Sequence, residues 1–587
     1  MRNLVVVFFV LIVSTSVLAV GIDNPSIVNY MEAEIYQSGN VSIGNGGLSL
    51  QLDVYVPQDT KTQKVKILEA STDYSLEEDK YGNQFVRFYW NKPNNMTNFW
   101  IKSNVIVTRQ EKMPIENEKF FSYPTDLIES SNPEIIEFAE NITLGKKGFE
   151  KIGELGKWVN TNIEYDLGYK DVNLSGTKIL ETRAGVCSEY STLFESFARA
   201  IGFETRSTLG YVISQYQEPY DFEAHSWSEV KIDNYYIPVD PTWAEGGVVD
   251  ATHIKFATFP DAIFNQATAK ATSTRSNSGG ISIEINTDID ILNFSSEPIV
   301  GVTNFVIDNN LWDGNAIVKS ELSYNDCVLM KVKKISCGVG NDFLLDIRDP
   351  NEVIYFCGEK DHFTIFDIPS NLKSTSFYTC PINVYPNLGL ADTIDLTLKN
   401  EFNYENKIGL GVSSNSVLPG ERVVLTSENN FIFTSNGDWE VGNLVINPKD
   451  SLIVYAYHNG HLVEEKISVV NTKPFVLGVE ANDTMVYGNN YTVNVTIENL
   501  VEYEQAIKIK ISDKEDIVNI GASSKKIVEF LITADQPVVQ VFGETDEFST
   551  SSSEEITLLI RKSFIDDILN FINKIIFNIS ILMESIK

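Results

Sequence analysis

Much of the chain alternates apolar and polar residues with a period of two, which is the pattern of a half-buried β-strand. Residues 48–54 alternate in this way, and residues 85–90 follow the turn signal Tyr81-Gly82-Asn83. Residues 104–108 predict another short strand. We therefore expect residues 22–115 to form a small antiparallel β-domain.

The pattern changes to helical spacing in residues 122–262, where apolar residues recur every three or four positions. Gly202 follows the third predicted helix as a stop signal, and Asp233-Asn234 predicts the turn of a hairpin. Helices followed by antiparallel strands predict an α+β domain. The predicted helices are 134–140, 149–162 and 189–200, and the predicted strands are 205–213, 226–232 and 235–239.

The β pattern returns after residue 279 and continues to about residue 560. Short alternating segments separated by Gly, Asn, Asp and Pro predict a series of immunoglobulin-like β-sandwich domains, which we place at 280–400, 401–473 and 474–562. Residues 563–587 again show helical spacing, but charged residues interrupt the apolar face. This segment predicts an amphipathic helix that packs on protein or lies on a membrane surface rather than spanning it.

The first residues have the features of a secretory signal peptide. Arg2 supplies a positive charge, residues 4–13 are wholly apolar, and Ala19 offers a small residue for cleavage. The alternative is an uncleaved anchor, but the apolar run is short for a membrane span. We therefore expect residues 1–19 to be cleaved off and the mature protein to be secreted or held at the cell surface. Nine Asn-x-Ser/Thr sequons are compatible with a glycoprotein.

The 587 residues carry 46 lysines and arginines against 80 acidic residues, a net charge of -34. Such a surface repels phosphates, so nucleic acid is not an expected partner. The hydrophobic content of 43% is ample for several globular domains.

Cysteine usage agrees with export. Cys187 stands alone, whereas the other four cysteines lie together in the 280–400 region and could form two disulfides of undetermined pairing. Their spacing contains no CxxC pair, which makes a zinc site the less favoured interpretation. These four residues are Cys327, Cys337, Cys357 and Cys380.

Cys187 is the first candidate for chemistry. It follows Gly185-Val186 and comes directly before a predicted helix, so its sulfur is expected at a helix N-terminus. Unsatisfied amides and the helix dipole there stabilise a thiolate over a thiol, and the same amides could bind an oxyanion. A buried structural cysteine is the alternative, because free cysteine packs as a small hydrophobe.

His225 and Asp240 supply the groups that a cysteine nucleophile needs. His225 lies at the head of a predicted strand, where a neutral imidazole can take the thiol proton. Asp240 ends the following strand, and the hairpin should bring it near His225 to fix the ring's tautomer. Each residue taken alone has a structural alternative. His225 could be a buried structural histidine, and Asp240 could close the turn before Pro241.

Taken together, these motifs resemble the core of the transglutaminase-like superfamily. The resemblance covers residues 148–243 and rests on Gly185-Val186-Cys187, Gly202-Phe203-Glu204-Thr205-Arg206, His225-Ser226-Trp227-Ser228-Glu229-Val230 and Asp240-Pro241-Thr242. It implies a papain-like α+β core with Cys187, His225 and Asp240 as catalytic residues, here flanked by all-β domains. The β-rich stretch before it is also similar to a module that often precedes this core in prokaryotic members.

The resemblance further implies a side-chain donor to the oxyanion, for which Tyr165 is the candidate, with a packing role as its alternative. Calcium-dependent eukaryotic members have a tryptophan beside the nucleophile, where Ser188 stands here. A calcium switch is therefore not carried over, and we expect no cofactor and no catalytic metal.

These expectations favour thiol acyl transfer on a protein or peptide substrate of the cell envelope, with hydrolysis slightly favoured over crosslinking. The alternative is a non-catalytic surface protein for adhesion or envelope assembly, in which the core is a binding module. In either case the C-terminal helix is a candidate contact with a membrane or with an assembly.

Overall fold

The computed structural model describes residues 22–559 with interruptions. The predicted signal peptide and the predicted C-terminal helix lie outside the described residues. The other segments outside them are 44–46, 171, 215–220, 264, 274–279, 308–313, 336–345, 350, 369–376, 391–392, 400–407, 418–419, 459, 470–472, 502 and 546–547.

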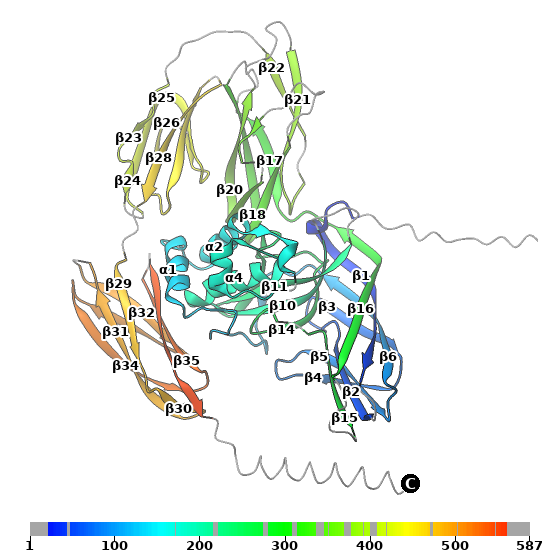
Figure 1. Cartoon of the computed structure of the whole chain (residues 1–587). Helices are drawn as coiled ribbons and strands as arrows, with labels where there is room; N and C mark the ends of the chain where they lie inside the picture. The colour runs from blue at the N-terminus through cyan, green and yellow to red at the C-terminus, as the bar shows by residue number, and fades with distance from the viewer. Residues whose placement is uncertain are drawn as a thin grey trace, which may run out of the picture.

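The N-terminal domain is a sandwich of two four-stranded antiparallel sheets, ordered β16-β1-β6-β3 and β15-β2-β5-β4 (Figure 1). From Leu50 onward, every second residue of β2 is buried between the sheets, as its alternating sequence predicts, whereas Leu48 is exposed. The strands are β1 (Val28–Ser42), β2 (Gly47–Tyr55), β3 (Gln63–Ala70), β4 (Tyr74–Glu78), β5 (Gln84–Asn91), β6 (Met96–Thr108), β15 (Ala267–Ser273) and β16 (Ser282–Ser296).

The boundary expected at residue 280 differs from the structure. β16 pairs along the whole of β1, from Val28 opposite Ser296 to Ser42 opposite Ser282, and β15 pairs with β2. The chain thus leaves the N-terminal domain, forms the α+β core and returns to complete both sheets. Strand pairing between segments so far apart in sequence has no local signal.

The α+β core packs four helices on an antiparallel sheet, with α4 at the centre (Figure 1). Helix α1 begins at Pro133 after Asn132, whose side chain accepts a hydrogen bond from the Glu134 amide at 2.9 Å. The predicted helices are present, and α3 is additional. The helices are α1 (Pro133–Ile142), α2 (Phe149–Asn162), α3 (Gly176–Thr182) and α4 (Cys187–Ala200); short 3-10 turns span Pro25–Ile27 and Leu167–Tyr169.

The core sheet continues into the next domain. Its strands run in the order β14-β10-β11-β12-β13-β18-β20, so the long strands β18 and β20 extend it. Helix α2 approaches these strands closely, because Gly153 and Gly156 leave room for Tyr355 and Leu329. The core strands of this sheet are β7 (Met113–Pro114), β10 (Glu204–Ile213), β11 (Phe222–Ile232), β12 (Tyr235–Asp240), β13 (Glu245–Gly246) and β14 (Ile254–Phe259). Two short strands, β8 (Glu164–Tyr165) and β9 (Ala184–Gly185), pair separately with each other.

The third domain contains Cys327 and Cys357, which face each other on paired strands and form a disulfide. Cys380 is not a free thiol either, and Cys337 lies outside the described residues. The strands are β17 (Gly301–Val306), β18 (Gly314–Ile335), β19 (Asp346–Ile347), β20 (Asn351–Ile368), β21 (Phe377–Pro386) and β22 (Ile394–Lys399).

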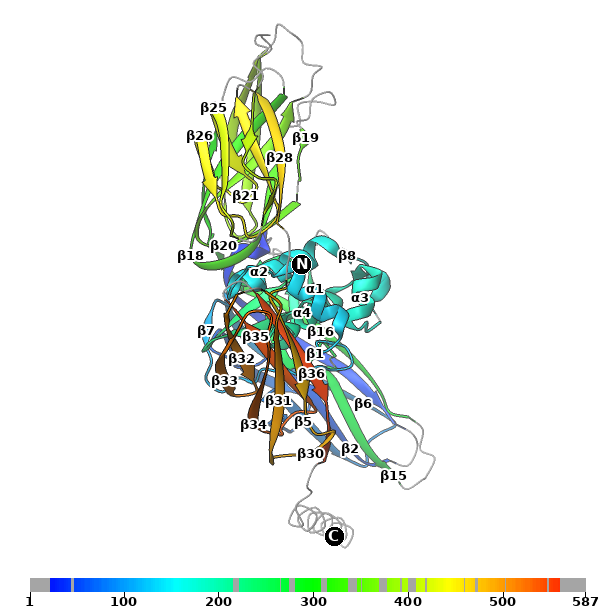
Figure 2. The same ribbon diagram turned by 90° about the vertical axis from the view of Figure 1, so that its left-hand side faces the viewer.

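Two further β-sandwich units follow among the described residues, each with its own hydrophobic core. The last of them packs on the α+β core, with β36 beside α1 (Figure 2). The first contains β23 (Gly411–Val412), β24 (Ser416–Val417), β25 (Val423–Thr434), β26 (Trp439–Ile446), β27 (Leu452–His458) and β28 (His461–Val469). The second contains β29 (Phe475–Glu480), β30 (Thr484–Val486), β31 (Asn490–Asn499), β32 (Gln505–Ile511), β33 (Lys514–Ile520), β34 (Lys525–Thr533), β35 (Val538–Glu544), β36 (Ser549–Glu555) and β37 (Thr557–Leu559).

The fold is therefore multidomain, with an α+β core flanked by β-sandwich domains, as the sequence predicts. Within the described residues, none of the helices is both long and apolar enough to cross a membrane.

Candidate active site

Cys187 is the first residue of α4, and the turn before it is held by Glu189. The Glu189 carboxylate accepts hydrogen bonds from the Val186 amide and the Ser188 hydroxyl, both at 3.0 Å. A Cβ at Gly185 would lie 2.3 Å from the Glu189 Cβ, so only glycine fits there. This arrangement places the half-exposed Cys187 side chain at the N-terminus of the buried central helix.

Tyr165 reaches the same place from the segment before the cysteine. It lies on β8, which pairs in parallel with β9, so that Tyr165 is opposite Gly185. Burial, followed by the charge of Cys187, raises the pKa of the Tyr165 hydroxyl. The residue also packs against Tyr190, with ring centroids 6.1 Å apart. Its neighbourhood is therefore compatible with both interpretations, oxyanion donor and packing residue.

His225 lies on β11 with Gly210 opposite on β10. A Cβ at Gly210 would lie 1.9 Å from the Ile254 carbonyl oxygen, so glycine here lets β14 pair closely behind the site. Ser226, the next residue, ties this strand to the nucleophile's helix: its hydroxyl donates to the Cys187 carbonyl at 3.2 Å. In return, the Ser191 hydroxyl donates to the Ser226 carbonyl at 3.1 Å.

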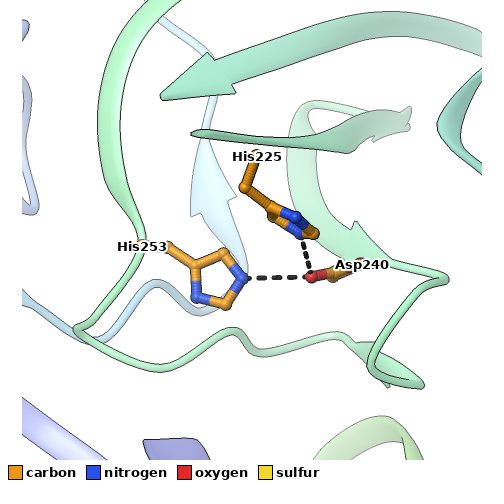
Figure 3. A group of neighbouring side chains, drawn as sticks. All are labelled: His225, Asp240 and His253. Carbon is orange, nitrogen blue, oxygen red and sulfur yellow. Dashed lines mark hydrogen bonds and ion pairs between the residues drawn. The ribbon is translucent and has the colours of Figure 1, made fainter. Parts of the chain in front are cut away.

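The His225 and Asp240 side chains meet at the end of the hairpin. His225 Nε2 lies 2.7 Å from Asp240 Oδ2, and both side chains are buried (Figure 3). The other oxygen of Asp240 accepts from the Thr242 amide at 2.8 Å. Burial raises the pKa of Asp240, but the charge and hydrogen bond of His225 outweigh it and hold that pKa well below its usual range. Asp240 is thus an ionised acceptor.

The second nitrogen of His225 is left for the thiol. Burial lowers the pKa of the imidazole, but the charges of Asp240 and Cys187, and hydrogen bonds to both, raise it to about 9. Because Nε2 is engaged by Asp240, Nδ1 is the nitrogen that remains available to the sulfur of Cys187. The arrangement can accept a proton from the thiol and hold the resulting imidazolium beside a thiolate.

Two indole rings fix the plane of the imidazole. His225 stacks on Trp227 at 6.2 Å and on Trp243 at 5.9 Å between ring centroids, with interplanar angles of 18° and 22°. Trp227 is fully buried, and Trp243 follows the turn after Asp240. The ring therefore has little freedom to rotate away from its partners.

A buried ion pair anchors α4 to the sheet below the site. Arg199 donates to Glu195 at 2.9 Å, four residues earlier on the same helix, and both side chains have 0% exposure. Glu195 also accepts from Ser207 on β10 at 2.8 Å and from Ser228 on β11 at 2.9 Å. These contacts set the depth at which the helix lies on the strands that carry His225.

Sequence reasoning did not identify the second histidine at Asp240. His253 Nε2 lies 3.2 Å from Asp240 Oδ2, the oxygen that also bonds His225 (Figure 3). The signal available was its position: it is one of only five histidines in the chain and lies 13 residues after Asp240. His253 takes part in two buried groups of metal-ligand type among the described residues, one with His225 and Asp240 and one with Glu245 and Asp250.

Comparison with known proteins identifies the family of the α+β core. Residues 136–241 match the family model of the transglutaminase-like superfamily. This interval contains α2, α4, β11 and the residues Cys187, His225 and Asp240, whereas His253 lies just beyond it. No curated protein matches the chain.

Several solved structures share parts of the architecture at low identity. A candidate cysteine protease from Cytophaga hutchinsonii is 20% identical, covers 46% of this chain and 93% of its own, and gives a TM-score of 0.34. A structure that concerns the host cell surface retention of a 1.5-MDa bacterial ice-binding adhesin is 12% identical, covers 45% of this chain and 99% of its own, and gives a TM-score of 0.16. The four N-terminal immunoglobulin domains of Dscam1 are 9% identical, cover 49% of this chain and 82% of their own, and give a TM-score of 0.20.

Scores at this level carry no argument about activity. The family match and the α+β fold together give one conclusion: this chain carries a transglutaminase-like domain at residues 136–241, set among β-sandwich domains.

Proposed function

We propose that this protein is an extracellular thiol acyl-transfer enzyme that acts on protein or peptide amides through Cys187, His225 and Asp240. The observation that carries the proposal is the 2.7 Å contact between His225 Nε2 and Asp240, which leaves Nδ1 for the sulfur of Cys187. A buried structural cysteine requires neither an oriented imidazole nor an ionised carboxylate. Nucleophilic catalysis requires both.

The first half-reaction forms an acyl-enzyme. The Cys187 sulfur, having given its proton to His225 Nδ1, attacks the amide carbonyl carbon and forms a C–S bond. The carbonyl electrons move to oxygen, and His225 then returns the proton to the departing amine as the C–N bond breaks. Asp240 keeps the imidazolium oriented throughout, because its contact with Nε2 is unchanged.

The second half-reaction releases the acyl group. A water molecule or an amine gives a proton to His225 Nδ1 and attacks the thioester carbon. The C–S bond then breaks, and His225 returns that proton to the departing sulfur to restore the thiol. Amides at the start of α4 and the Tyr165 hydroxyl are the proposed donors to the oxyanion. Water gives hydrolysis and lysine gives a crosslink; we favour hydrolysis by the small margin that the resemblance to prokaryotic members supports.

The extracellular setting rests on separate observations. The Cys327–Cys357 disulfide is typical of an oxidising compartment, and the apolar run after Arg2 has the pattern of a signal peptide. The long series of β-sandwich domains also favours a second candidate, an adhesion protein in which the core only binds. An ionised Asp240 aligned on His225 argues for the enzyme.

Product analysis separates these readings. Wild type and Cys187→Ala are each incubated with peptides from digested envelope protein, in water and with an added lysine analogue, and the products are identified by mass spectrometry. New peptide ends or deamidated glutamine support hydrolysis, and isopeptides or incorporated amine support crosslinking. No difference between the two proteins across both incubations contradicts the proposal and favours the adhesion protein.

A further inference from the structure

A second buried group of charged side chains lies next to Asp240, to which one of its members, His253, is hydrogen-bonded. Glu245 is on β13, whereas Asp250 and His253 are in the segment that leads to β14. All three side chains are fully buried, and one ligand atom from each lies within 4.8 Å of the other two. The mechanism proposed above uses none of them directly.

The polar atoms of this group lack the partners that buried polar atoms normally have. Neither carboxylate oxygen of Glu245 makes a hydrogen bond of good geometry, although the Ser26 hydroxyl approaches this carboxylate. Asp250 Oδ2 and His253 Nδ1 also lack one, and His253 Nδ1 lies 3.5 Å from Asp250 Oδ1. Since more than nine in ten buried polar groups are satisfied in folded proteins, four such atoms converging at one place indicate a missing binding partner.

The charges point to a cation. Two carboxylates, those of Glu245 and Asp250, are fully buried side by side, with ligand atoms within 4.8 Å of each other. Among the described residues, neither oxygen of Glu245 is hydrogen-bonded to a lysine or an arginine. An unpaired buried carboxylate is costly, and buried charges are normally paired or bound to metal.

We propose that Glu245, Asp250 and His253 bind a divalent metal ion of the Zn2+ type. One imidazole nitrogen and two carboxylate oxygens are a zinc ligand set, whereas Ca2+ and Mg2+ bind through oxygen ligands. Zinc bonds of about 2.0–2.2 Å place neighbouring ligand atoms roughly 3.3 Å apart in a tetrahedron. Small rotations of these side chains bring atoms now within 4.8 Å to that spacing.

Asp240 completes the arrangement as the partner of the metal-bound imidazole. With His253 Nδ1 on the metal, its Nε2 carries the proton and donates it to Asp240 Oδ2 at 3.2 Å. A ligating histidine usually donates its other N–H to a carboxylate, which orients the ring. Here that carboxylate also bonds His225 at 2.7 Å, so a metal-bound His253 would help to hold Asp240 in position for His225.

The other group, His225 with Asp240 and His253, is the less suitable site. Asp240 Oδ2 already accepts from both imidazoles, so both of these hydrogen bonds would have to break for a metal to bind. At the proposed site, the Glu245 oxygens, Asp250 Oδ2 and His253 Nδ1 make no hydrogen bond of good geometry, so metal binding through these atoms would break none.

The test uses full-length protein carrying Cys187→Ala, because a thiolate is itself a zinc ligand. The protein is stripped with a chelator, reloaded with Zn2+, dialysed and assayed for metal by mass spectrometry. About one equivalent per chain is expected. Glu245→Gln, Asp250→Asn and His253→Gln should each weaken Zn2+ binding by at least about tenfold, and Asp240→Asn by about 10–100-fold.

Glu204→Gln is the matched control, because Glu204 is a half-buried carboxylate on β10 paired with Lys231. It should bind as much metal as the parent protein. Co2+ in place of Zn2+ gives a visible spectrum that reports the ligands, and a spectrum of nitrogen and oxygen ligands is expected. Circular dichroism identifies variants that fail to fold.

Three outcomes overturn the proposal: no bound Zn2+ in the folded parent protein, retained binding in folded Glu245→Gln and Asp250→Asn, or loss in His225→Ala with the Glu245 variant unaffected. The last result would move the metal to the catalytic side. None of these measurements depends on enzymatic activity, so failure of the metal site and failure of the proposed reaction are distinguishable.

Discussion

At the residue scale, the chemistry depends on which way one imidazole ring is turned. His225 uses Nε2 for Asp240, and stacking on Trp227 and Trp243 keeps the ring in that plane. The pKa of about 9 makes the imidazolium the favoured form at neutral pH. Burial by itself lowers the pKa of His225, and the ionised Asp240 together with the neighbouring sulfur raises it above the ordinary value.

Asp240→Asn should therefore lower activity far more than it lowers stability. An amide in place of the carboxylate no longer compensates the imidazolium and favours the wrong tautomer of His225. We expect kcat/KM to fall by about 10²–10⁴-fold, measured with whichever amide substrate the product analysis identifies. Asp288→Asn, a similar change at an exposed position on β16, is the control and should leave kcat/KM unchanged. Equal activity in the two variants would contradict the role of Asp240.

At the element scale, the start of α4 and its anchoring decide where the thiol lies. The helix begins at Cys187 because Glu189 satisfies the Val186 amide, and Gly185 leaves space for that side chain. The Glu195–Arg199 pair then joins the helix to β10 and β11. Two predictions follow from these contacts.

Gly185→Ala should misplace the nucleophile. The added methyl group would lie 2.3 Å from the Glu189 Cβ, a distance that backbone or side chain must relieve. We expect a destabilisation of about 1–3 kcal/mol together with slower modification of Cys187. Gly478→Ala on β29 is the matched control, because its nearest neighbour would lie 3.6 Å away. Thermal unfolding and thiol labelling of both variants provide the comparison, and equal behaviour would refute this account of the turn.

Arg199→Leu should be the more damaging change. It leaves the Glu195 carboxyl buried at 0% exposure without its counter-ion, and it removes donors to the Tyr123 and Pro260 carbonyls. Breaking a buried ion pair in this way costs about 3–5 kcal/mol. Lys178→Leu removes a fully exposed pair with Glu181 on α3 and should change the unfolding midpoint little. A midpoint for Arg199→Leu within error of wild type would show that the pair does not anchor the helix.

The sequence predicts these elements well but not all of their partners. Helical spacing and the Asp233-Asn234 turn are local signals, and they lead to α4, the hairpin and the Cys187, His225, Asp240 order. Pairing of β16 with β1, and the approach of His253 to Asp240, depend on tertiary packing and leave no mark on local periodicity.

At the scale of the whole molecule, the β-sandwich domains are attached to the core by specific contacts. The Ser551 amide of β36 donates to Glu140 of α1 at 3.1 Å, and Lys473 lies 3.3 Å from the same carboxylate. Phe542 of β35 packs on Gly202, where φ is +99° and a Cβ would lie 3.0 Å from the ring. The last domain therefore covers the C-terminal end of α4, opposite to the end that carries Cys187.

Phe542→Ala should loosen this contact without unfolding the core. We expect faster limited proteolysis at Lys473, because its contact with Glu140 of the core is lost when the last domain undocks. Cleavage is followed by gel and mass spectrometry, with Phe305→Ala, an exposed position on β17, as control. Identical cleavage rates in the two variants would show that Phe542 does not hold the domain in place.

The central claim is that His225 and Asp240 act on the sulfur of Cys187, and its most direct measurement is the alkylation rate of that thiol. Iodoacetamide labelling at pH about 6, where an ordinary thiol with a pKa of about 8.5 is almost fully protonated, reports thiolate held by a neighbouring cation. Fast labelling of wild-type protein, lost in folded His225→Ala, is the predicted result. Labelling as slow as a free cysteine, or unaffected by the loss of His225, would contradict the account.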